Sequence, residues 1–165
     1  MDQSSSFEDQ LAALLPRLRR FAHSLSRDAA DADDLTQATI ERALRSRDRW
    51  QPGSRLDSWS YRIMRNLWID TARSRSRKSA HEAPEGEALN VGKDPRHAMD
   101  ASIDLDRIMR AMSQLPDEQR EVVALILVEG FGYREVSEML DLPIGTVSSR
   151  LVRGRTALLA MVGEQ

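Results

Sequence analysis

The chain has 165 residues, 41% of them hydrophobic, and a formal net charge of −2; this length suits one domain or two small ones. It contains no cysteine, which excludes disulfides and thiolate metal sites. The histidines, His23, His81 and His97, are scattered without metal-ligand spacing. Neither an apolar run of the roughly 18 residues that a membrane span needs nor a signal-peptide pattern is present. We therefore expect a cytoplasmic protein with no metal, no cofactor and no membrane insertion.

Helical periodicity dominates the first part of the chain. Apolar residues recur at helical spacing within 11–25 and again within 35–44. A third helix is expected from about Asp57 or Ser58, where a polar side chain suits the N-cap position. No stretch alternates β-branched with polar residues over a useful length. The sequence thus predicts an all-α fold.

The second and third predicted helices carry opposite charges. Acidic and amide side chains share one face of the second helix: Asp33, Asp34, Gln37 and Glu41. From Arg42 to Lys78 there are eleven lysines and arginines against three aspartates. Such blocks favour separate surfaces for separate partners, a basic protein surface for the first and nucleic acid for the second. Solvated charged faces without a partner are the alternative.

On the third helix, four residues are spaced so that they share one face: Arg62, Asn66, Arg73 and Arg77. Aromatic residues Tyr61 and Trp68 lie on an adjacent face. Cations follow a phosphate backbone, and exposed aromatic rings stack on unpaired bases. The pattern favours a surface that holds opened DNA, although burial of both aromatic rings in the core remains open.

A segment rich in Pro and Gly, 79–98, has almost no large apolar side chains and is predicted to be a flexible linker. It divides the chain into a first domain, 1–78, and a second, 99–165, which we expect to move independently. Helicity resumes near Met99, with four apolar residues expected in the second core: Leu105, Ile108, Met109 and Met112.

The last part of the chain has the pattern of a helix-turn-helix. Pro116 and Asp117 suit a first helical turn, and Gly130 suits the end of that helix. A short helix is expected over 133–140, and a longer one over 144–160. Small polar and cationic side chains remain on the outer face of the long helix, as insertion into a DNA major groove requires. An ordinary helical hairpin with a solvated basic face is the alternative.

Four segments, in order, resemble the extracytoplasmic-function (ECF) sigma factors of the sigma-70 family. They are DADDLTQ (31–37), SWSYRIMRNLWID (58–70), LPDEQREV (115–122) and GTVSSRL (145–151). These bacterial initiation factors have two helical domains, region 2 and region 4, and no domain between them. The resemblance covers nearly the whole chain apart from the linker and the ends.

The resemblance implies a role for each surface. The face of Asp33, Asp34, Gln37 and Glu41 would bind the β′ clamp of core RNA polymerase, and region 4 would sit on the β flap. The −10 element would be captured by the loop 45–57 and by Arg62, Arg65, Asn66, Arg73 and Arg77. The −35 element would be recognised by Ser148, Ser149, Arg150, Val152, Arg153 and Arg155. A family member of this type usually has an anti-sigma factor as a further partner.

The chain departs from the usual family pattern at three positions. Ala38 replaces an acid that commonly follows the glutamine, which weakens the expected clamp contact. Asp141 replaces a frequent turn glycine, and Asp tolerates a left-handed backbone better than most residues. Ser148 replaces a residue that is often basic, so the base preference at that position is open.

Two other classes of function compete with a sigma factor. A stand-alone helix-turn-helix regulator would use only 115–160 and would leave the acidic face and the basic third helix unexplained. An enzyme is disfavoured because no Ser-His-Asp order, glycine-rich phosphate loop or metal-ligand spacing accompanies the acids. We therefore predict no catalytic residues.

Overall fold

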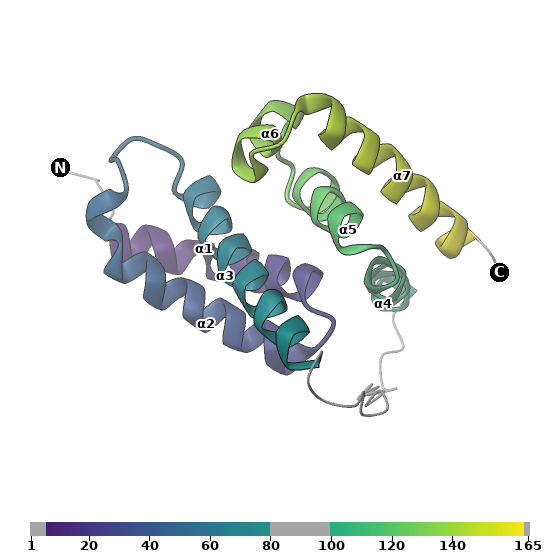
Figure 1. Cartoon of the computed structure of the whole chain (residues 1–165), viewed down its shortest axis with the longest axis horizontal. Helices are drawn as coiled ribbons and strands as arrows, with labels where there is room; N and C mark the ends of the chain where they lie inside the picture. Colours follow the sequence, from purple (N-terminus) through teal and green to yellow (C-terminus); the bar gives the residue numbers. More distant parts are fainter. Residues whose placement is uncertain (1–5, 80–99, 164–165) are drawn as a thin grey trace.

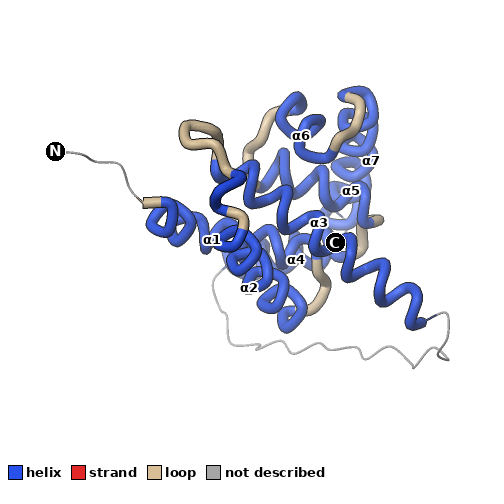
Figure 2. Tube along the Cα trace, turned by 60° about the vertical axis from the view of Figure 1, so that its left-hand side comes forward, coloured by secondary structure: helices blue, strands red, loops and turns tan. Residues whose placement is uncertain are grey.

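The computed structural model describes residues 6–79 and 100–163, and all regular secondary structure within these ranges is helical. The helices form two groups that lie side by side, one from each described range (Figures 1 and 2). We call residues 6–79 the N-terminal half and residues 100–163 the C-terminal half. The predicted all-α fold is confirmed for this part of the chain.

The N-terminal half is a bundle of three helices with one short turn of 3-10 helix. Its elements are α1 (Phe7–Leu25), α2 (Ala29–Arg45), η1 (Arg47–Arg49) and α3 (Leu56–Ser79). Ser6 and Asp28 cap α1 and α2 by accepting backbone N–H groups of the first turn. The three helices pack around a core that includes Leu18, Phe21 and Met64, all fully buried.

The C-terminal half contains four α-helices and one turn of π-helix. Its elements are α4 (Asp100–Ser113), α5 (Asp117–Val123), η2 (Ala124–Val128), α6 (Tyr133–Leu140) and α7 (Ile144–Gly163). Gly130, two residues after the end of η2, has a φ of +79°, and Asp141 ends α6 with a φ of +53°. The left-handed turn predicted to tolerate Asp141 is therefore present, and α6 and α7 form a helix-turn-helix.

Two expectations about the second core are wrong. Leu105 and Ile108 were expected inside, and both are exposed on α4, whereas Met112 is buried and Met109 is partly buried. The reason is that α4 packs mainly on α7 and α1 through only part of its surface. Helical spacing alone does not reveal how wide the covered face of a helix is.

The two halves are packed against each other, unlike the independent domains expected from the sequence. Helix α3 contacts α6, and α1 contacts α4, α5 and η2. Buried polar groups from one half find their partners in the other, so the sequence pattern of each half alone gave no sign of this contact. The predicted linker 79–98 lies outside the described residues, except that Ser79 is the last residue of α3.

Within residues 6–79 and 100–163, no helix combines the length and the apolar character that crossing a membrane requires.

We predict that Gly154→Ala destabilises the protein. Gly154 is buried where α7 crosses α5, and a Cβ atom there would lie 2.7 Å from Val123 Cγ2 and 3.2 Å from Gln119 Cβ. Overpacking of this kind costs about 1–3 kcal/mol in the free energy of unfolding, which urea denaturation measures. Gly145→Ala is the control, because nothing lies within 4 Å of a Cβ at Gly145. Equal stability of the two variants would contradict the close approach of α5 and α7.

Candidate functional site

The predicted acidic face lies on the outer side of α2. Asp33, Asp34, Gln37 and Glu41 are all exposed, because Ala32, Leu35, Thr36, Thr39 and Ala43 occupy the buried side of the same helix. None of the four makes an ion pair with another described residue. The face is thus a free, negatively charged surface that suits a basic protein partner.

The beginning of α2 is tied to the far end of α3. Arg75 donates two hydrogen bonds to Asp31, at 2.7 and 2.6 Å. These bonds lower the pKa of the Asp31 carboxyl, so it stays ionised beside the guanidinium. The contact links the beginning of α2 to the basic end of α3.

The predicted basic residues of α3 differ in their surroundings. Arg62, Asn66, Arg73 and Arg77 are exposed, and Arg65 is half-buried. Tyr61 is buried and Trp68 is half-buried, so the proposed row of exposed aromatic rings is not present. Tyr61 instead packs edge-on against Phe21, with ring centroids 4.8 Å apart. The surface is therefore less aromatic than the sequence indicated.

A pocket of about 250 Å³ opens beside these arginines, between the end of α2 and the first half of α3. Its lining combines aromatic, cationic, amide and acidic groups: Arg42, Ser46, Arg49, Trp59, Arg62, Ile63, Asn66, Leu67 and Asp70. An indole face beside guanidinium groups suits a flat, polar ring with a phosphate next to it.

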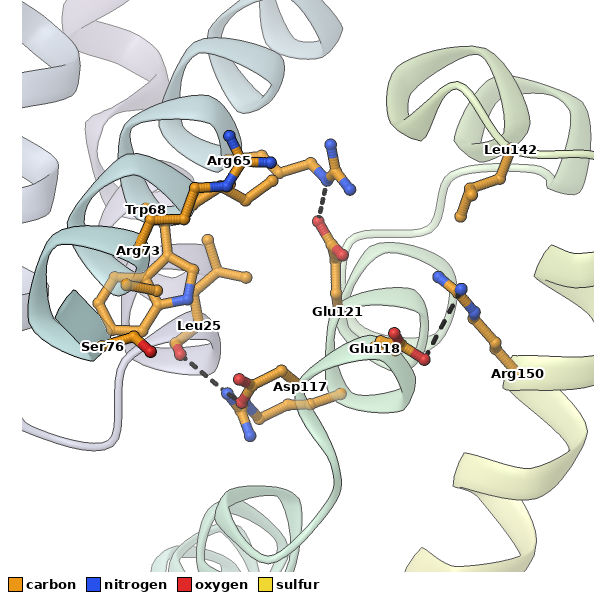
Figure 3. Close-up of a pocket in the computed structure, with 13 residues that line it drawn as sticks. Leu25, Arg65, Trp68, Arg73, Ser76, Asp117, Glu118, Glu121, Leu142 and Arg150 are labelled. Carbon is orange, nitrogen blue, oxygen red and sulfur yellow. Dashed lines mark hydrogen bonds and ion pairs between the residues drawn. The ribbon is translucent and has the colours of Figure 1, made fainter. Parts of the chain in front are cut away.

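The predicted residues of α7 fall into two groups. Ser149, Val152, Arg153 and Arg155 are exposed, whereas Ser148 and Arg150 are half-buried. Val147, Leu151 and Gly154 occupy the buried side of α7, which orients the others outward. Arg150 lies 3.7 Å from Glu118 of α5, as measured between Nη2 and Oε2 (Figure 3). Arg153 and Arg155 are the cations left for an external ligand.

The packing of the two halves joins the predicted DNA-binding helix α3 to the C-terminal half. Arg62 donates a hydrogen bond of 2.9 Å to the Glu138 carbonyl oxygen of α6. Arg65 pairs with Glu121 of α5, and the ion pair spans the boundary between the halves (Figure 3). Burial raises the pKa of Glu121, and Arg65 partly opposes that change. A pocket of about 460 Å³ lies at this boundary, lined by residues that include Arg65, Arg73 and Arg150.

Sequence reasoning missed the residues that hold the halves together. Glu129 follows η2, and its side chain has no exposed surface. Both carboxylate oxygens accept hydrogen bonds of 2.8 Å from Arg20, and the Tyr61 hydroxyl donates another of 2.8 Å. Burial raises the pKa of the Tyr61 hydroxyl, and its hydrogen bond to Glu129 raises it further. No periodic pattern points to this cluster, because the two donors lie 109 and 68 positions from Glu129 in the chain.

Among the described residues, no group of three or more His, Cys, Asp or Glu side chains is arranged to hold a metal ion.

Family models match both halves of the chain: "Sigma-70 region 2" matches residues 11–78, and "Sigma-70, region 4" matches residues 105–158. The ECF RNA polymerase sigma factor EcfG of Rhodopseudomonas palustris is 36% identical over 98% of this chain and 88% of its own length. The sigma factor RpoE from Bartonella quintana, solved in complex with the anti-sigma factor NepR, is 31% identical with a TM-score of 0.83, covering 95% of this chain and 96% of that chain. CnrH, solved in complex with the cytosolic domain of CnrY, is 25% identical with a TM-score of 0.68. The match covers 95% of this chain and 87% of that chain.

We predict that Tyr61→Phe lowers the free energy of unfolding by about 1–3 kcal/mol, because the buried Glu129 carboxylate loses one hydrogen-bond donor. Tyr133→Phe is the matched control, since Tyr133 is exposed on α6. Urea denaturation of both variants measures the difference. Equal stability of the two would show that the Tyr61 hydroxyl is not needed in the cluster.

Proposed function

This chain belongs to the ECF sigma factors of the sigma-70 family, and we propose that its two halves divide the work of promoter recognition. As an alternative sigma factor it binds core RNA polymerase and directs promoter-specific transcription initiation; the family is one of non-enzymatic initiation factors. We assign residues 1–78 to polymerase and −10 binding, 79–98 to the connection, and 99–165 to −35 binding. We place the protein in the cytoplasm, where RNA polymerase acts.

The exposed acidic face of α2 is the proposed contact with the β′ clamp of polymerase. Its support is the position of Asp33, Asp34, Gln37 and Glu41 on one unpaired surface. Charge complementarity with a basic partner contributes register and association rate. Ala38, where an acid is frequent in the family, is half-buried beside this face and adds no charge to it.

The basic side of α3 and the loop before it are the proposed site for the melted −10 element. Arg62, Asn66, Arg73 and Arg77 present polar groups to solvent along α3. The neighbouring pocket, with Trp59 in its wall, fits a single unpaired base. Arg65 joins this surface when its pair with Glu121 is broken.

Helix α7 is the proposed reader of the −35 element. Ser149, Val152, Arg153 and Arg155 extend from its outer side, as a recognition helix in the major groove requires. Val152 is 61% exposed and offers an apolar contact for a thymine methyl group. Ser148 and Arg150 are less accessible and are assigned to the edge of this surface.

The observation that carries the proposal is the family match to both halves in the right order. A stand-alone helix-turn-helix regulator would not need the first half. The test is run-off transcription with core RNA polymerase: the chain should confer promoter-specific initiation on core enzyme. DNA binding by the chain alone, with no effect on core enzyme, would favour a regulator. An anti-sigma factor is a further proposed partner, because the RpoE relative was solved with one.

We predict that Asp34→Arg combined with Gln37→Ala lowers the affinity for core polymerase without unfolding the protein. Both side chains are exposed, and charge reversal places like charges together at the interface, a penalty of several kcal/mol. Competition binding to core enzyme measures the effect. Asp104→Arg, an exposed acid of α4, is the control with the same charge change. Unchanged binding by the double variant would reject the assignment of the acidic face.

We predict that promoter binding through α7 and promoter binding through α3 depend differently on DNA sequence and on salt concentration. Arg153→Ala should weaken promoter binding by about 1–3 kcal/mol in a manner that depends on the −35 sequence. Arg73→Ala should weaken all promoters alike and reduce the slope of log K against log salt, as loss of a phosphate contact does. Holoenzyme binding to promoters with altered −35 elements distinguishes the two. The same sequence-independent loss for both would make Arg153 a phosphate contact.

A further inference from the structure

The first turn of α1 lies against the segment that the proposed function assigns to the −10 element. Phe7 opens α1, and Ser6 caps this end by accepting a hydrogen bond of 3.1 Å from the Asp9 backbone N–H. Phe7 contacts η1, which follows α2, and the first part of α3 (Figure 1). All of these contacts lie within residues 6–79, so they do not involve the C-terminal half.

Phe7 contacts two tryptophans, one within residues 45–57, which we call the −10 loop, and one just after it. The centre of its ring lies 5.5 Å from that of Trp50 and 6.0 Å from that of Trp59, and the second contact is edge-on. The loop residues between the tryptophans, 51–55, are all exposed and supply little apolar packing of their own. Since aromatic pairs at such distances have a preferred geometry, Phe7 connects the two sides of the −10 loop.

The orientation of the Trp50 indole depends on ring packing. Its Nε1 atom is buried and has no hydrogen-bond partner among the described residues, whereas a buried indole N–H usually finds one. No polar contact of the side chain therefore directs the ring. The Trp50 backbone N–H donates to the Arg47 carbonyl oxygen at 3.1 Å, so the main chain is fixed at the end of η1. Packing against Phe7 then determines where the indole lies.

Arg47 of η1 makes two further contacts with the first turn of α1. Its guanidinium lies 5.8 Å from the centre of the Phe7 ring and forms an ion pair with Glu8. Its Nε also donates to the Leu44 carbonyl oxygen at 3.4 Å, near the C-terminal end of α2, where a cation is favoured. The ion pair is about half exposed and contributes little alone, but with the ring contact it holds the guanidinium over α1. Arg47 is thus engaged within the chain, whereas Arg49 lines the neighbouring pocket.

The chain held in this way contributes to the pocket of about 250 Å³ that is proposed for an unpaired base. Arg42, Ser46 and Arg49 line the pocket from α2 and η1, and Trp59 lines it from α3. Trp59 therefore both contacts Phe7 and belongs to the pocket. A binding site works only when supporting contacts hold its side chains within about 0.5 Å of the required geometry. Phe7 provides such a contact and is not itself a lining residue.

We propose that Phe7 and Arg47 are positioning residues of the −10 site: together they hold η1 and Trp59 in the arrangement that receives an unpaired base. The inference rests on the proposed −10 role of the loop and of α3. Neither side chain touches DNA. Phe7 acts through Trp50 and Trp59, and Arg47 fastens η1 to the first turn of α1. Loss of the Phe7 ring therefore lowers −10 recognition and leaves −35 recognition and core binding unchanged.

The test compares Phe7→Ala with Leu14→Ala in the full chain assembled with core polymerase. Leu14 is another partly buried apolar residue of α1, so its truncation controls for a general loss of stability. The probe is a fluorescent single-stranded oligonucleotide with the −10 element of a promoter selected by run-off transcription, compared with the same oligonucleotide after that element is scrambled. Phe7→Ala should reduce the preference for the −10 element about tenfold, and Phe7→Tyr, which keeps the ring, should retain it. Equal preference in Phe7→Ala and Leu14→Ala would overturn the proposal.

Hydrogen exchange of the free chain shows whether Phe7 acts through the −10 loop. The backbone N–H groups of Arg49 and Trp50 donate to carbonyl oxygens of the same short turn at 2.8 and 3.1 Å. Both amides should exchange faster in Phe7→Ala than in Leu14→Ala. Unchanged exchange, even with weaker −10 binding, would overturn the proposal because Phe7 would then act on DNA directly. Faster exchange without any loss of −10 preference would overturn it as well.

Salt dependence separates the two arginines of η1. Arg49→Ala should reduce the slope of log K against log salt by about one, as loss of a phosphate contact does, whereas Arg47→Ala should weaken binding with the slope unchanged. The same reduction for both would make Arg47 a phosphate contact and overturn its positioning role. In the same series, weaker binding by Arg62→Ala would keep the proposed −10 surface whatever Phe7→Ala does. No loss in Arg62→Ala would remove that surface and this inference with it.

Discussion

One buried carboxylate fixes the arrangement of this molecule. Glu129 has no exposed side-chain surface, and its hydrogen-bond donors come from Arg20 and Tyr61 of the other half. Taking a carboxylate out of water is favourable only when such donors compensate for lost hydration. The end of η2 must therefore lie against α1 and α3. This position in turn places Phe131 in its aromatic contact and α6 beside α3, so the helix-turn-helix is located by a residue outside it.

The arginine-rich surface proposed to bind DNA also makes contacts within the chain. A guanidinium group binds carboxylate and phosphate oxygens with the same geometry, so the acids of the C-terminal half are effective substitutes for a DNA backbone. Arg65 and Glu121 illustrate this, since an ion pair within the chain uses the cation proposed for the promoter. Intramolecular pairing has the advantage of high effective concentration.

The exposed surfaces follow from how each helix is covered. Helix α2 is buried on one side only, so its acids remain free for a partner, and α7 is buried along Val147, Leu151 and Gly154, so its arginines face outward. The tight contact at Gly154 lets α7 approach α5 closely. The direction of each exposed face thus depends on the buried residues of the same helix.

The sequence by itself determined the helices, their order and the charge of their outer faces, because periodicity, caps and glycine or proline signals act within a few neighbouring residues. The bounds of α6 and the left-handed Asp141 are examples of such local control. Tertiary structure decided which side chains of each helix are buried: Tyr61 is buried, and Leu105 is exposed. It also decided which distant residues meet, as Glu129 and Arg20 do across 109 positions. These outcomes depend on the relative placement of whole helices. Burial and ion pairing between distant segments are set by three-dimensional packing, and no local pattern encodes them.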